Sequence, residues 1–474
     1  MTVTPDRVAS NHPVVPRPNL NDWVREDPRA GWPFTEESFV DLGSEDLAKE
    51  RYHSPEFHQL EVDKMWQRVW QMACRAEDIP HPGDTVVYDI ADLSVGVVRV
   101  DEATIKAYYN SCLHRGTALF PADDHIEEIR CRFHGMCWKL DGQLAQMPCR
   151  WDFPHVDARS FSLPEIKVDT WGGFVFVNFD PGAPPLAEYV GDLARHNAAF
   201  AHPWERRYKA VHVAKIIPIN WKAGMEAFIE AYHVPMTHGF GGMHTVSGQY
   251  DLWEGQPHFS RAAFGRHPDA PASPELSGDL VEAVRAKDVD NRTHWAANAT
   301  ADDPWACFDE ITDPEERRVI RAAAKGYRDG VAEMTGDDVS HISNSELNIY
   351  WEYFLFPNLM PWIGPFGFSG DLCYRFRPNG NDPNSSIMEV MMLYPVGSSG
   401  HPPAAKLRWL EPDQPWSSVH ELGSTGLILD QDDDNFALIQ KGLKAGGKPG
   451  VTLARYQESR IRHYHATLDA YLQG

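Results

Sequence analysis

Residues 110–144 read NSCLHRGTALFPADDHIEEIRCRFHGMCWKLDGQL and contain two short Cys–His pairs. Cys112 and His114 form the first pair, and Cys131 and His134 form the second after sixteen intervening residues. Two such pairs on separate loops can hold a metal centre between sulfur and nitrogen ligands. The residue types fit either a zinc ion with two thiolates and two imidazoles or a [2Fe–2S] cluster whose two irons are bound by different ligands.

The order of the ligands along the chain separates these two alternatives. Zinc fingers normally pair Cys with Cys and His with His, and their second half is helical. Here each loop contributes one Cys and one His between expected strands, and Gly116 and Gly135 follow closely. This arrangement favours the iron–sulfur cluster. We interpret the nearby Cys137 as a small core residue rather than as a further ligand.

The pairing of C-x-H-R-G with C-x-x-H-G resembles the motif of the Rieske family. High-potential respiratory Rieske subunits add two cysteines that form a disulfide, and a serine near the cluster. The corresponding positions here are Thr117, Phe133 and Met136. The site therefore resembles the low-potential type found in oxygenases. Met136 stands where an aromatic residue is more usual, so the packing of this loop is expected to differ.

A second set of candidate ligands lies at residues 220–238, NWKAGMEAFIEAYHVPMTH. Apolar residues at three- and four-residue steps predict one buried helical face. These residues are Trp221, Met225, Phe228, Ile229 and Tyr232. We expect Glu226, Glu230 and His233 to lie together on the flank of that face, because steps of three, four and seven residues stay on one side of a helix.

Pro235 is expected to end this helix just after His233. With the break, the imidazoles of His233 and His238 can turn toward one ion. A facial triad adds one carboxylate ligand and leaves positions open for dioxygen. The alternative is a helix followed by a loop with ordinary surface histidines.

The same stretch resembles the catalytic motif of Rieske non-haem iron ring-hydroxylating oxygenase large (alpha) subunits. That family has a carboxylate three residues before the first His, a Tyr directly before it and a second His five residues after it. Glu230, Tyr232, His233 and His238 match these positions, whereas Ala227 stands where an Asn is often found. The resemblance implies that the two histidines bind a mononuclear Fe(II) and that Glu230 and Tyr232 have catalytic roles.

The resemblance places the third iron ligand far downstream in a helix, and residues 427–443, LILDQDDDNFALIQKGL, offer four aspartates. An apolar stripe on this helix is predicted from Leu429, Phe436, Ile439 and Leu443. Asp432 lies in the gap of the stripe, and Asp430, Asp433 and Asp434 are expected to point to solvent. Asp432 is therefore the predicted ligand, with a helix N-cap as the alternative.

Short strand-like runs fill residues 84–185 and predict a small all-β domain. The runs are residues 85–92, 93–100, 105–110 and 172–179. We expect an N-terminal arm at 1–45, an all-β Rieske [2Fe–2S] domain with a leading helix at 46–185, and a catalytic mononuclear-iron domain at 186–474. Helices flank long β-like runs at 347–356, 371–378 and 386–396, which predicts an α+β class with an antiparallel sheet for the larger domain. The resemblance implies a helix-grip (START/Bet v1-like) fold there.

Composition excludes several classes of partner. The 474 residues carry a formal net charge of −24, which argues against binding to nucleic acid or to an anionic membrane surface. The chain starts without an apolar signal region and has no run of eighteen apolar residues, so no membrane span is expected. Seven cysteines, an odd number, indicate a reducing compartment and predict a cytoplasmic protein.

The resemblance covers nearly the whole chain and implies the oxygenase component of a multicomponent Rieske dioxygenase of aromatic hydrocarbon catabolism. Such a component uses O₂ to hydroxylate a small aromatic or cyclic apolar substrate, here expected to be by cis-dihydroxylation. No dinucleotide fingerprint and no plant-type C-x4-C-x2-C are present, so a separate ferredoxin and/or flavin reductase is expected to deliver electrons from NAD(P)H. A homotrimer is implied, with or without a small beta subunit, in which Glu230 bridges His233 to His134 of the next copy.

Three other functions remain alternatives at this point. A Rieske monooxygenase or an N-/O-demethylase would use the same metals on a different substrate. An electron-transfer Rieske protein would need only the cluster, and a zinc-stabilised binding module would need neither the cluster nor the mononuclear iron. The predicted substrate-pocket residues are Met236, Phe240, Trp351 and Phe354.

Overall fold

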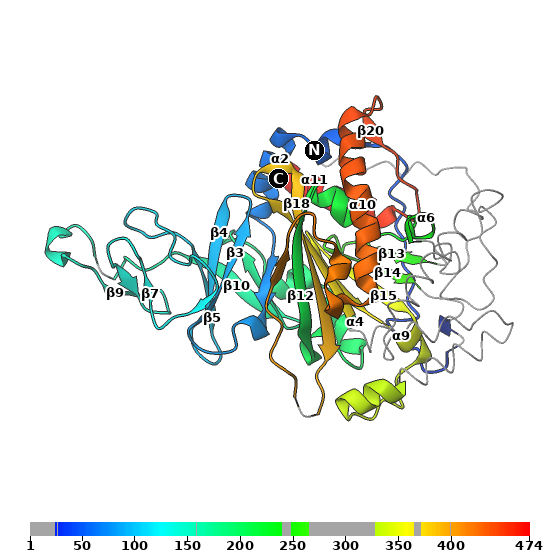
Figure 1. The fold of residues 1–474 in the computed structure, drawn as a ribbon, viewed down its shortest axis with the longest axis horizontal. Helices are drawn as coiled ribbons and strands as arrows, with labels where there is room; N and C mark the ends of the chain where they lie inside the picture. Colours follow the sequence, from blue (N-terminus) through cyan, green and yellow to red (C-terminus); the bar gives the residue numbers. More distant parts are fainter. Residues whose placement is uncertain are drawn as a thin grey trace.

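The computed structural model describes residues 24–25, 27–157, 159–238, 248–264, 328–364, 371–398 and 400–474. In these ranges the backbone forms a seven-stranded and an eight-stranded sheet, with a three-stranded and a two-stranded sheet beside them. Figure 1 shows the seven-stranded sheet on one side of the eight-stranded sheet and a layer of helices on its other side. Within the described residues, no helix has the length and apolar character that crossing a bilayer requires.

The seven-stranded sheet is antiparallel throughout and agrees with the predicted all-β region. In spatial order its strands are β2 (Gln71–Arg75), β11 (Phe174–Asn178), β10 (Glu165–Trp171), β5 (Ile105–Tyr109), β4 (Leu93–Arg99), β3 (Asp84–Ile90) and β6 (Asp124–His125). The three-stranded sheet consists of β7 (Ile129–Arg130), β8 (Cys137–Trp138) and β9 (Leu144–Gln146). In Figure 1 this small sheet lies at the far end of the molecule.

The eight-stranded sheet carries the larger α+β unit. In spatial order its strands are β13 (Gln249–Asp251), β14 (Phe259–Phe264), β15 (Tyr350–Leu355), β16 (Leu359–Ile363), β17 (Asp371–Asn379), β18 (Asp382–Pro395), β12 (Arg207–Ile217) and β19 (Arg408–Leu410). The three predicted runs correspond to β15, β17 and β18. Neighbouring strands are antiparallel except for β12 and β19, which are parallel.

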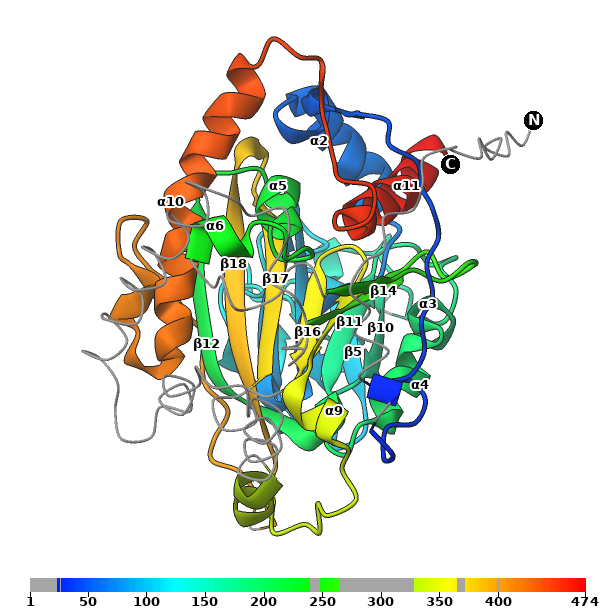
Figure 2. The ribbon, with the colours of Figure 1, turned by 90° about the vertical axis from the view of Figure 1, so that its right-hand side faces the viewer.

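One face of the eight-stranded sheet is covered by helices, and Figure 2 shows α5, α6, α10 and α11 in front of its strands. The α-helices are α2 (Pro55–Glu61), α3 (Leu186–Val190), α4 (Leu193–Ala199), α5 (Trp221–Glu226), α6 (Val234–His238), α9 (Asn344–Asn348), α10 (Ser424–Ala445) and α11 (Ser459–Gln473). Shorter elements are β1 (Leu47–Ala48), β20 (Gly450–Val451), a π-helical turn η2 (Val62–Trp66), and the 3₁₀ turns η1 (Lys49–Tyr52), η3 (Ala76–Asp78), η4 (Arg150–Asp152), η5 (Trp204–Arg206), η9 (Trp416–Ser418) and η10 (His420–Leu422).

The helix predicted over residues 220–238 is interrupted earlier than expected. It ends at Glu226, and a turn separates α5 from α6, which begins at Val234. Pro235 therefore lies within the first turn of α6, where a proline fits because its missing N–H has no helical partner to lose. The prediction that Pro235 ends the helix was wrong.

A side chain in the turn explains the interruption. The Glu230 carboxylate accepts hydrogen bonds from the backbone N–H groups of Tyr232 and His233, the latter at 3.1 Å. Such a local side-chain acceptor competes with continued helix formation. As a result Glu226 is not on a common flank with Glu230, and Tyr232 is 57% exposed rather than part of the buried face.

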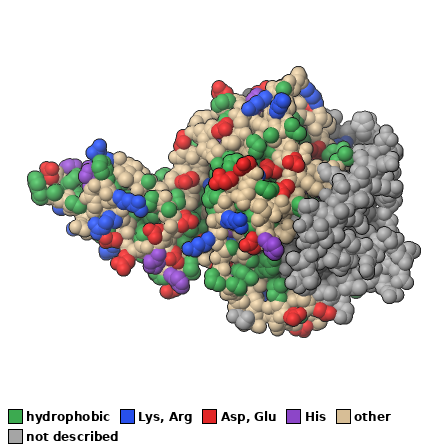
Figure 3. All heavy atoms as spheres, in the orientation of Figure 1, with side chains coloured by type: hydrophobic (Ala, Val, Ile, Leu, Met, Phe, Trp, Pro, Cys, Tyr) green, Lys and Arg blue, Asp and Glu red, His purple; other side chains and the backbone are tan. Residues whose placement is uncertain are grey.

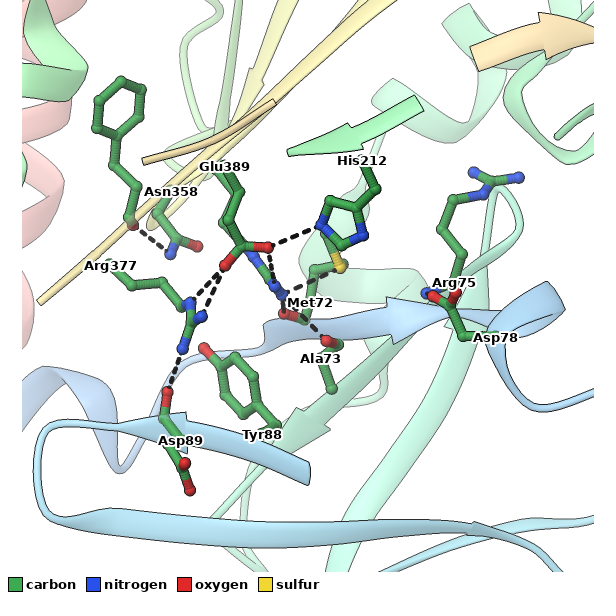
Figure 4. Close-up of polar contacts among 12 residues, drawn as sticks. Met72, Ala73, Arg75, Asp78, Tyr88, Asp89, His212, Asn358, Arg377 and Glu389 are labelled. Atoms are coloured by element: carbon green, nitrogen blue, oxygen red, sulfur yellow. Dashed lines mark hydrogen bonds and ion pairs between the residues drawn. The ribbon is translucent and has the colours of Figure 1, made fainter. Parts of the chain in front are cut away.

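Two arginines of β17 join the eight-stranded sheet to the seven-stranded sheet. Arg375 Nη1 donates to the backbone carbonyls of Met72 (2.6 Å) and Ala73 (3.0 Å) on β2. Arg377 Nη1 donates to the carbonyl of Asp89 on β3 at 2.6 Å. Figure 4 shows Arg377 directed at Asp89 across the junction between the sheets. Both guanidinium groups are buried, so each requires a compensating negative charge.

Glu389 on β18 supplies that charge. Its Oε1 accepts from Arg377 Nε at 2.8 Å, and its Oε2 contacts Arg375 Nη2 and, at 3.1 Å, His212 Nε2 on β12 (Figure 4). Burial alone would raise the pKa of Glu389, but Arg375 and Arg377 hold it well below its ordinary value. A carboxylate with a lowered folded-state pKa stabilises the fold above its unfolded pKa, and this contribution is lost as the pH falls through the folded pKa.

We expect Glu389→Gln to lower the free energy of unfolding by about 3–5 kcal/mol, because it leaves two buried guanidinium groups without their counter-charge. Chemical denaturation at neutral pH measures this loss, and the stability difference from the parent protein should shrink at strongly acidic pH. The matched control is Asp41→Asn, which removes the exposed ion pair with Arg455 and should cost about 1 kcal/mol or less. Equal effects of the two substitutions would contradict the role given to Glu389.

Candidate metal centres

Two loops of the same backbone design carry the four predicted cluster ligands. In each loop the N–H of the Cys (Cys112 or Cys131) donates at 2.8 Å to the carbonyl five residues later. The Gly four residues after each Cys donates back to the Cys carbonyl at 2.9–3.0 Å. Gly116 and Gly135 both have φ of 77°, in the left-handed region that favours glycine. The glycines of both motifs therefore close the loops that hold the ligands.

The side chains of these loops converge with sulfur inside and nitrogen outside. Cys112 and Cys131 are buried, and burial raises the pKa of Cys112. His114 Nδ1 lies 3.2 Å from His134 Nδ1 nearer the surface. Figure 3 shows hydrophobic, basic and histidine side chains together at this end of the molecule. Two thiols opposite two imidazoles form a donor set that fits a Rieske [2Fe–2S] cluster.

The residues around the loops have core roles. Met136 and Cys137 are buried, and Met136 belongs to the small apolar cluster that also contains Trp138. The Cys137 thiol points to the Trp138 carbonyl at 3.7 Å, and burial raises its pKa to about 12. A thiol held neutral in a core is a poor metal ligand. These contacts agree with the interpretation of Cys137 as a core residue.

At the other candidate centre, three side chains from α6, α10 and the turn before α6 meet on one face of the eight-stranded sheet. His233 Nε2 lies 3.3 Å from His238 Nε2 and 3.6 Å from Asp432 Oδ1. His238 Nε2 lies 3.3 Å from Asp432 Oδ1. Within the described ranges, these three residues form a group whose ligand atoms all lie within 4.8 Å of one another.

This geometry fits a single metal ion bound by three ligands on one face. Bonds of about 2.1 Å at right angles place ligand atoms about 3 Å apart, close to the three separations observed. His238 and Asp432 are only 3% and 5% exposed. Two imidazoles and one carboxylate with open positions are the donor set of non-haem Fe(II) oxygenases.

Glu230 holds the other side of the His233 ring. Its Oε1 lies 2.6 Å from His233 Nδ1, so Nδ1 carries the proton and Nε2 is available to a metal. Burial alone lowers the pKa of His233, but Glu230 and then Asp432 raise it, to about 8. Tyr232 contributes its backbone N–H to Glu230, while its side chain is exposed.

The helix α10 presents its aspartates differently from the prediction. Asp434 is exposed as expected, but Asp430 accepts from the backbone N–H of Trp416 at 2.6 Å. Asp433 Oδ2 contacts Lys215 Nζ at 2.5 Å. Ile439 is 41% exposed and so does not belong to the buried stripe. The expected solvent exposure of Asp430 and Asp433 was therefore wrong, because partners from η9 and β12 cover this turn of the helix. The stripe through Ile439 was also wrong, because this side chain faces solvent.

Sequence reasoning missed Gln431. Its Oε1 lies 2.8 Å from His238 Nδ1, and it directly precedes Asp432 on α10. No local pattern marks this glutamine, since its contact depends on how α10 packs against α6.

The predicted pocket residues lie in different surroundings. Met236 on α6 is 48% exposed, and Phe354 packs with its ring centroid 5.8 Å from that of Tyr464 on α11. Trp351 packs 5.2 Å from the Phe34 ring, on the face of β15 opposite to Phe354, because side chains alternate along a strand. Phe240 lies outside the described residues.

The two candidate centres are far apart within one chain. In Figure 1 the β7–β9 sheet that carries Cys131 and His134 lies at one end of the long axis, and α6 lies toward the other end, beyond the eight-stranded sheet.

Comparison with known proteins agrees with this two-part arrangement. The family model of the Rieske [2Fe–2S] domain matches residues 69–158, and that of the ring hydroxylating alpha subunit (catalytic domain) matches residues 195–474. The large oxygenase component of the naphthalene 1,2-dioxygenase system of Pseudomonas putida is 31% identical over 189 residues, which are 39% of this chain and 42% of that protein.

The oxygenase subunit of carnitine monooxygenase from Acinetobacter pittii is 26% identical over 237 residues, 48% of this chain and 63% of that protein. Both matches thus span less than two thirds of the relative. A crystal structure of a quaternary ammonium Rieske monooxygenase with an inhibitor has a TM-score of 0.63 at 16% identity, over 92% of this chain and 99% of that chain. At that identity the likeness shows the fold alone.

The catalytic-domain match covers more than half of the chain, and the Rieske match includes all four predicted cluster ligands. The expected cofactors, a Rieske [2Fe–2S] cluster and a mononuclear iron, are those of this family. The chain therefore belongs to the ring-hydroxylating oxygenase alpha subunit family, with a Rieske domain followed by a larger catalytic domain.

Proposed function

We propose that this chain is the oxygenase component of a multicomponent Rieske dioxygenase. The observation that carries the proposal is the meeting of His233, His238 and Asp432 with Glu230 on the far side of the His233 ring. The proposal keeps the division into an arm, a Rieske domain at 46–185 and a catalytic domain at 186–474.

In this proposal the residues of the two centres have separate tasks. Cys112, His114, Cys131 and His134 bind the cluster, and His233, His238 and Asp432 bind the iron. When bound, the ferrous ion activates O₂ and the cluster supplies electrons one at a time. Asp432 and the two Nε2 atoms hold one face of the site, which leaves the opposite face to dioxygen and substrate.

Glu230 is proposed to connect the two centres across subunits. Its Oε1 accepts the Nδ1 proton of His233 and keeps one further lone pair that can accept from a second imidazole, whereas Oε2 already accepts from two backbone N–H groups. Since the centres lie at opposite ends of one chain, the second imidazole is His134 of another copy, and a homotrimer closes this head-to-tail contact. A ferredoxin and/or a flavin reductase delivers the electrons from NAD(P)H, and a small beta subunit is compatible with the assembly.

Aromatic side chains beside the triad support an aromatic or cyclic apolar substrate. Burial, and next the Asp432 carboxylate, raise the pKa of Tyr374 well above its ordinary value. The Phe228 ring lies 4.8 Å from Tyr374 and 5.2 Å from Phe376. Trp362 lies 5.9 Å from Tyr374. Such surroundings favour binding of a flat apolar molecule, and we propose cis-dihydroxylation as the reaction.

A Rieske monooxygenase or N-/O-demethylase is the second candidate. The specific observation that favours it is the similarity to the carnitine monooxygenase oxygenase subunit, which aligns over a larger share of both chains than the naphthalene enzyme does.

Removal of one proposed iron ligand should empty the mononuclear site and leave the cluster site unchanged. We expect His238→Ala to lose the mononuclear iron, so that iron per chain falls by about one third while acid-labile sulfide stays constant. The Rieske electron paramagnetic resonance signal of the reduced protein should persist. Unchanged iron content would rule out His238 as a ligand, and absence of a Rieske signal from iron- and sulfide-replete wild-type protein would refute the cluster assignment.

A second substitution tests the bridging carboxylate. We expect Glu230→Gln to retain both metals and to slow product formation about 10- to 100-fold, because the amide no longer holds the His233 proton as a charged acceptor. Iron, sulfide and turnover are measured on the same preparations.

Glu226→Gln is the matched control for this experiment. Glu226 contacts Tyr52 Oη at 3.0 Å and His465 Nε2 at 2.8 Å, away from the triad, and burial raises its pKa to about 8. At pH 7 a glutamine therefore resembles its protonated form, and turnover should stay close to that of the parent. Normal turnover of Glu230→Gln would disprove the bridging role.

Isotope labelling distinguishes the two candidate reactions. With ¹⁸O₂ and aromatic, steroid-like and N-methyl substrates, we expect an aromatic or cyclic substrate to yield a cis-diol with both oxygens labelled. The products are identified by mass spectrometry. A single labelled oxygen, or release of a methyl group as formaldehyde, would replace the dioxygenase assignment with the monooxygenase or demethylase alternative.

A further inference from the structure

Gln431 contacts the ring of His238 on the edge turned away from the proposed metal position. Its Oε1 lies 2.8 Å from Nδ1 of His238, while Nε2 of the same ring faces His233 and Asp432. Gln431 and Asp432 are consecutive residues of α10. One turn of α10 thus places the Asp432 carboxylate beside Nε2 of His238 and the Gln431 amide beside Nδ1, on the opposite side of the same ring.

The contact determines which nitrogen of His238 carries the proton. A carbonyl oxygen only accepts, so Nδ1 must be protonated and Nε2 must present its lone pair to the metal position. The reverse arrangement, with the amide NH₂ donating to Nδ1, would put the proton on Nε2 and block the metal. The ring orientation observed at the triad therefore agrees with an acceptor at Nδ1.

The turn of α10 that carries Gln431 is held on two further sides. Asp430 accepts from the backbone N–H groups of Trp416 (2.6 Å) and Ser417 (3.2 Å) on η9. Asp433 pairs with Lys215 on β12. Because these contacts flank Gln431 and Asp432 in sequence, they fix the rotation of the helix about its axis. The amide of Gln431 is thereby held at one place relative to the His238 ring.

The two histidines differ in the charge of the acceptor behind them. His233 has the carboxylate of Glu230 and His238 has the neutral amide of Gln431. A ferrous ion with Asp432 and Glu230 sums to zero charge at this largely buried place. The amide therefore orients His238 without adding charge.

We propose that Gln431 is a positioning residue that fixes the tautomer and orientation of His238 for metal binding, an inference that rests on the proposed mononuclear iron site. Gln431 acts through His238 and contributes no ligand of its own.

The test is the affinity of the mononuclear site for ferrous ion, measured in the full-length protein with its cluster intact after mild chelation of the mononuclear iron. Gln431→Met keeps the length of the side chain and removes the carbonyl acceptor. We expect it to weaken Fe(II) binding about 10- to 100-fold. Gln431→Glu, a separate single substitution, retains an acceptor at the same position. We expect its Fe(II) affinity to stay within about threefold of wild type. Asp434→Asn on the exposed side of α10 is the control and should bind as wild type.

If Gln431 only stabilised the fold, the Fe(II) affinities of these variants would follow another pattern. If Met and Glu at position 431 weaken Fe(II) binding equally, or if neither changes it, the inference is overturned. An unchanged Rieske signal and circular dichroism spectrum verify that each variant is folded. His238→Ala is titrated with Fe(II) in the same way. If this variant still binds Fe(II), the proposed iron site is wrong. If it loses Fe(II) binding while Gln431→Met binds as wild type, only the role of Gln431 is overturned.

Discussion

Burial of the Asp432 carboxylate beside two imidazoles is the constraint on which this structure depends. A carboxylate that is 5% exposed on α10 needs a partner, and His233 and His238 meet it within 3.6 Å and 3.3 Å. That meeting requires α6 to lie against α10, as Figures 1 and 2 both show. It also requires the turn before α6, which Glu230 stabilises by accepting backbone N–H groups. The same contacts that satisfy buried charge thus assemble a metal-ion donor set.

Two glutamates four residues apart illustrate how surroundings separate chemical roles. Glu226 is buried with Tyr52 and His465, and its raised pKa, about 8, makes it a neutral hydrogen-bonding group. Glu230 instead contacts the His233 ring and two backbone N–H groups, which suit an ionised carboxylate. Only the second can serve as a charged acceptor behind a metal-binding imidazole.

The order of the layers in the molecule determines in which directions the two candidate centres face. Arg375, Arg377 and Glu389 hold the seven-stranded sheet against the eight-stranded sheet from one side, while α6 and α10 cover the other. The cluster loops and the iron site consequently face away from each other within one chain. A rigid ionic junction of this kind fixes the direction in which the Rieske end projects, and the proposed head-to-tail contact between copies depends on that direction.

The sequence alone determined those features that depend on the spacing of residues close together along the chain. The two Cys–His loops, their glycines and the His233–His238 spacing are short motifs, and the strand-like runs that form β3, β4, β5, β11, β15, β17 and β18 are legible at a range of a few residues. Periodicity also selected Asp432. The tertiary structure alone decided the early end of α5, the partners of Asp430 and Asp433, and the contact of Gln431 with His238. The contacts of Asp433 with Lys215 and of Gln431 with His238 join residues 218 and 193 positions apart in the chain. No periodicity within α10 records which element will cover it.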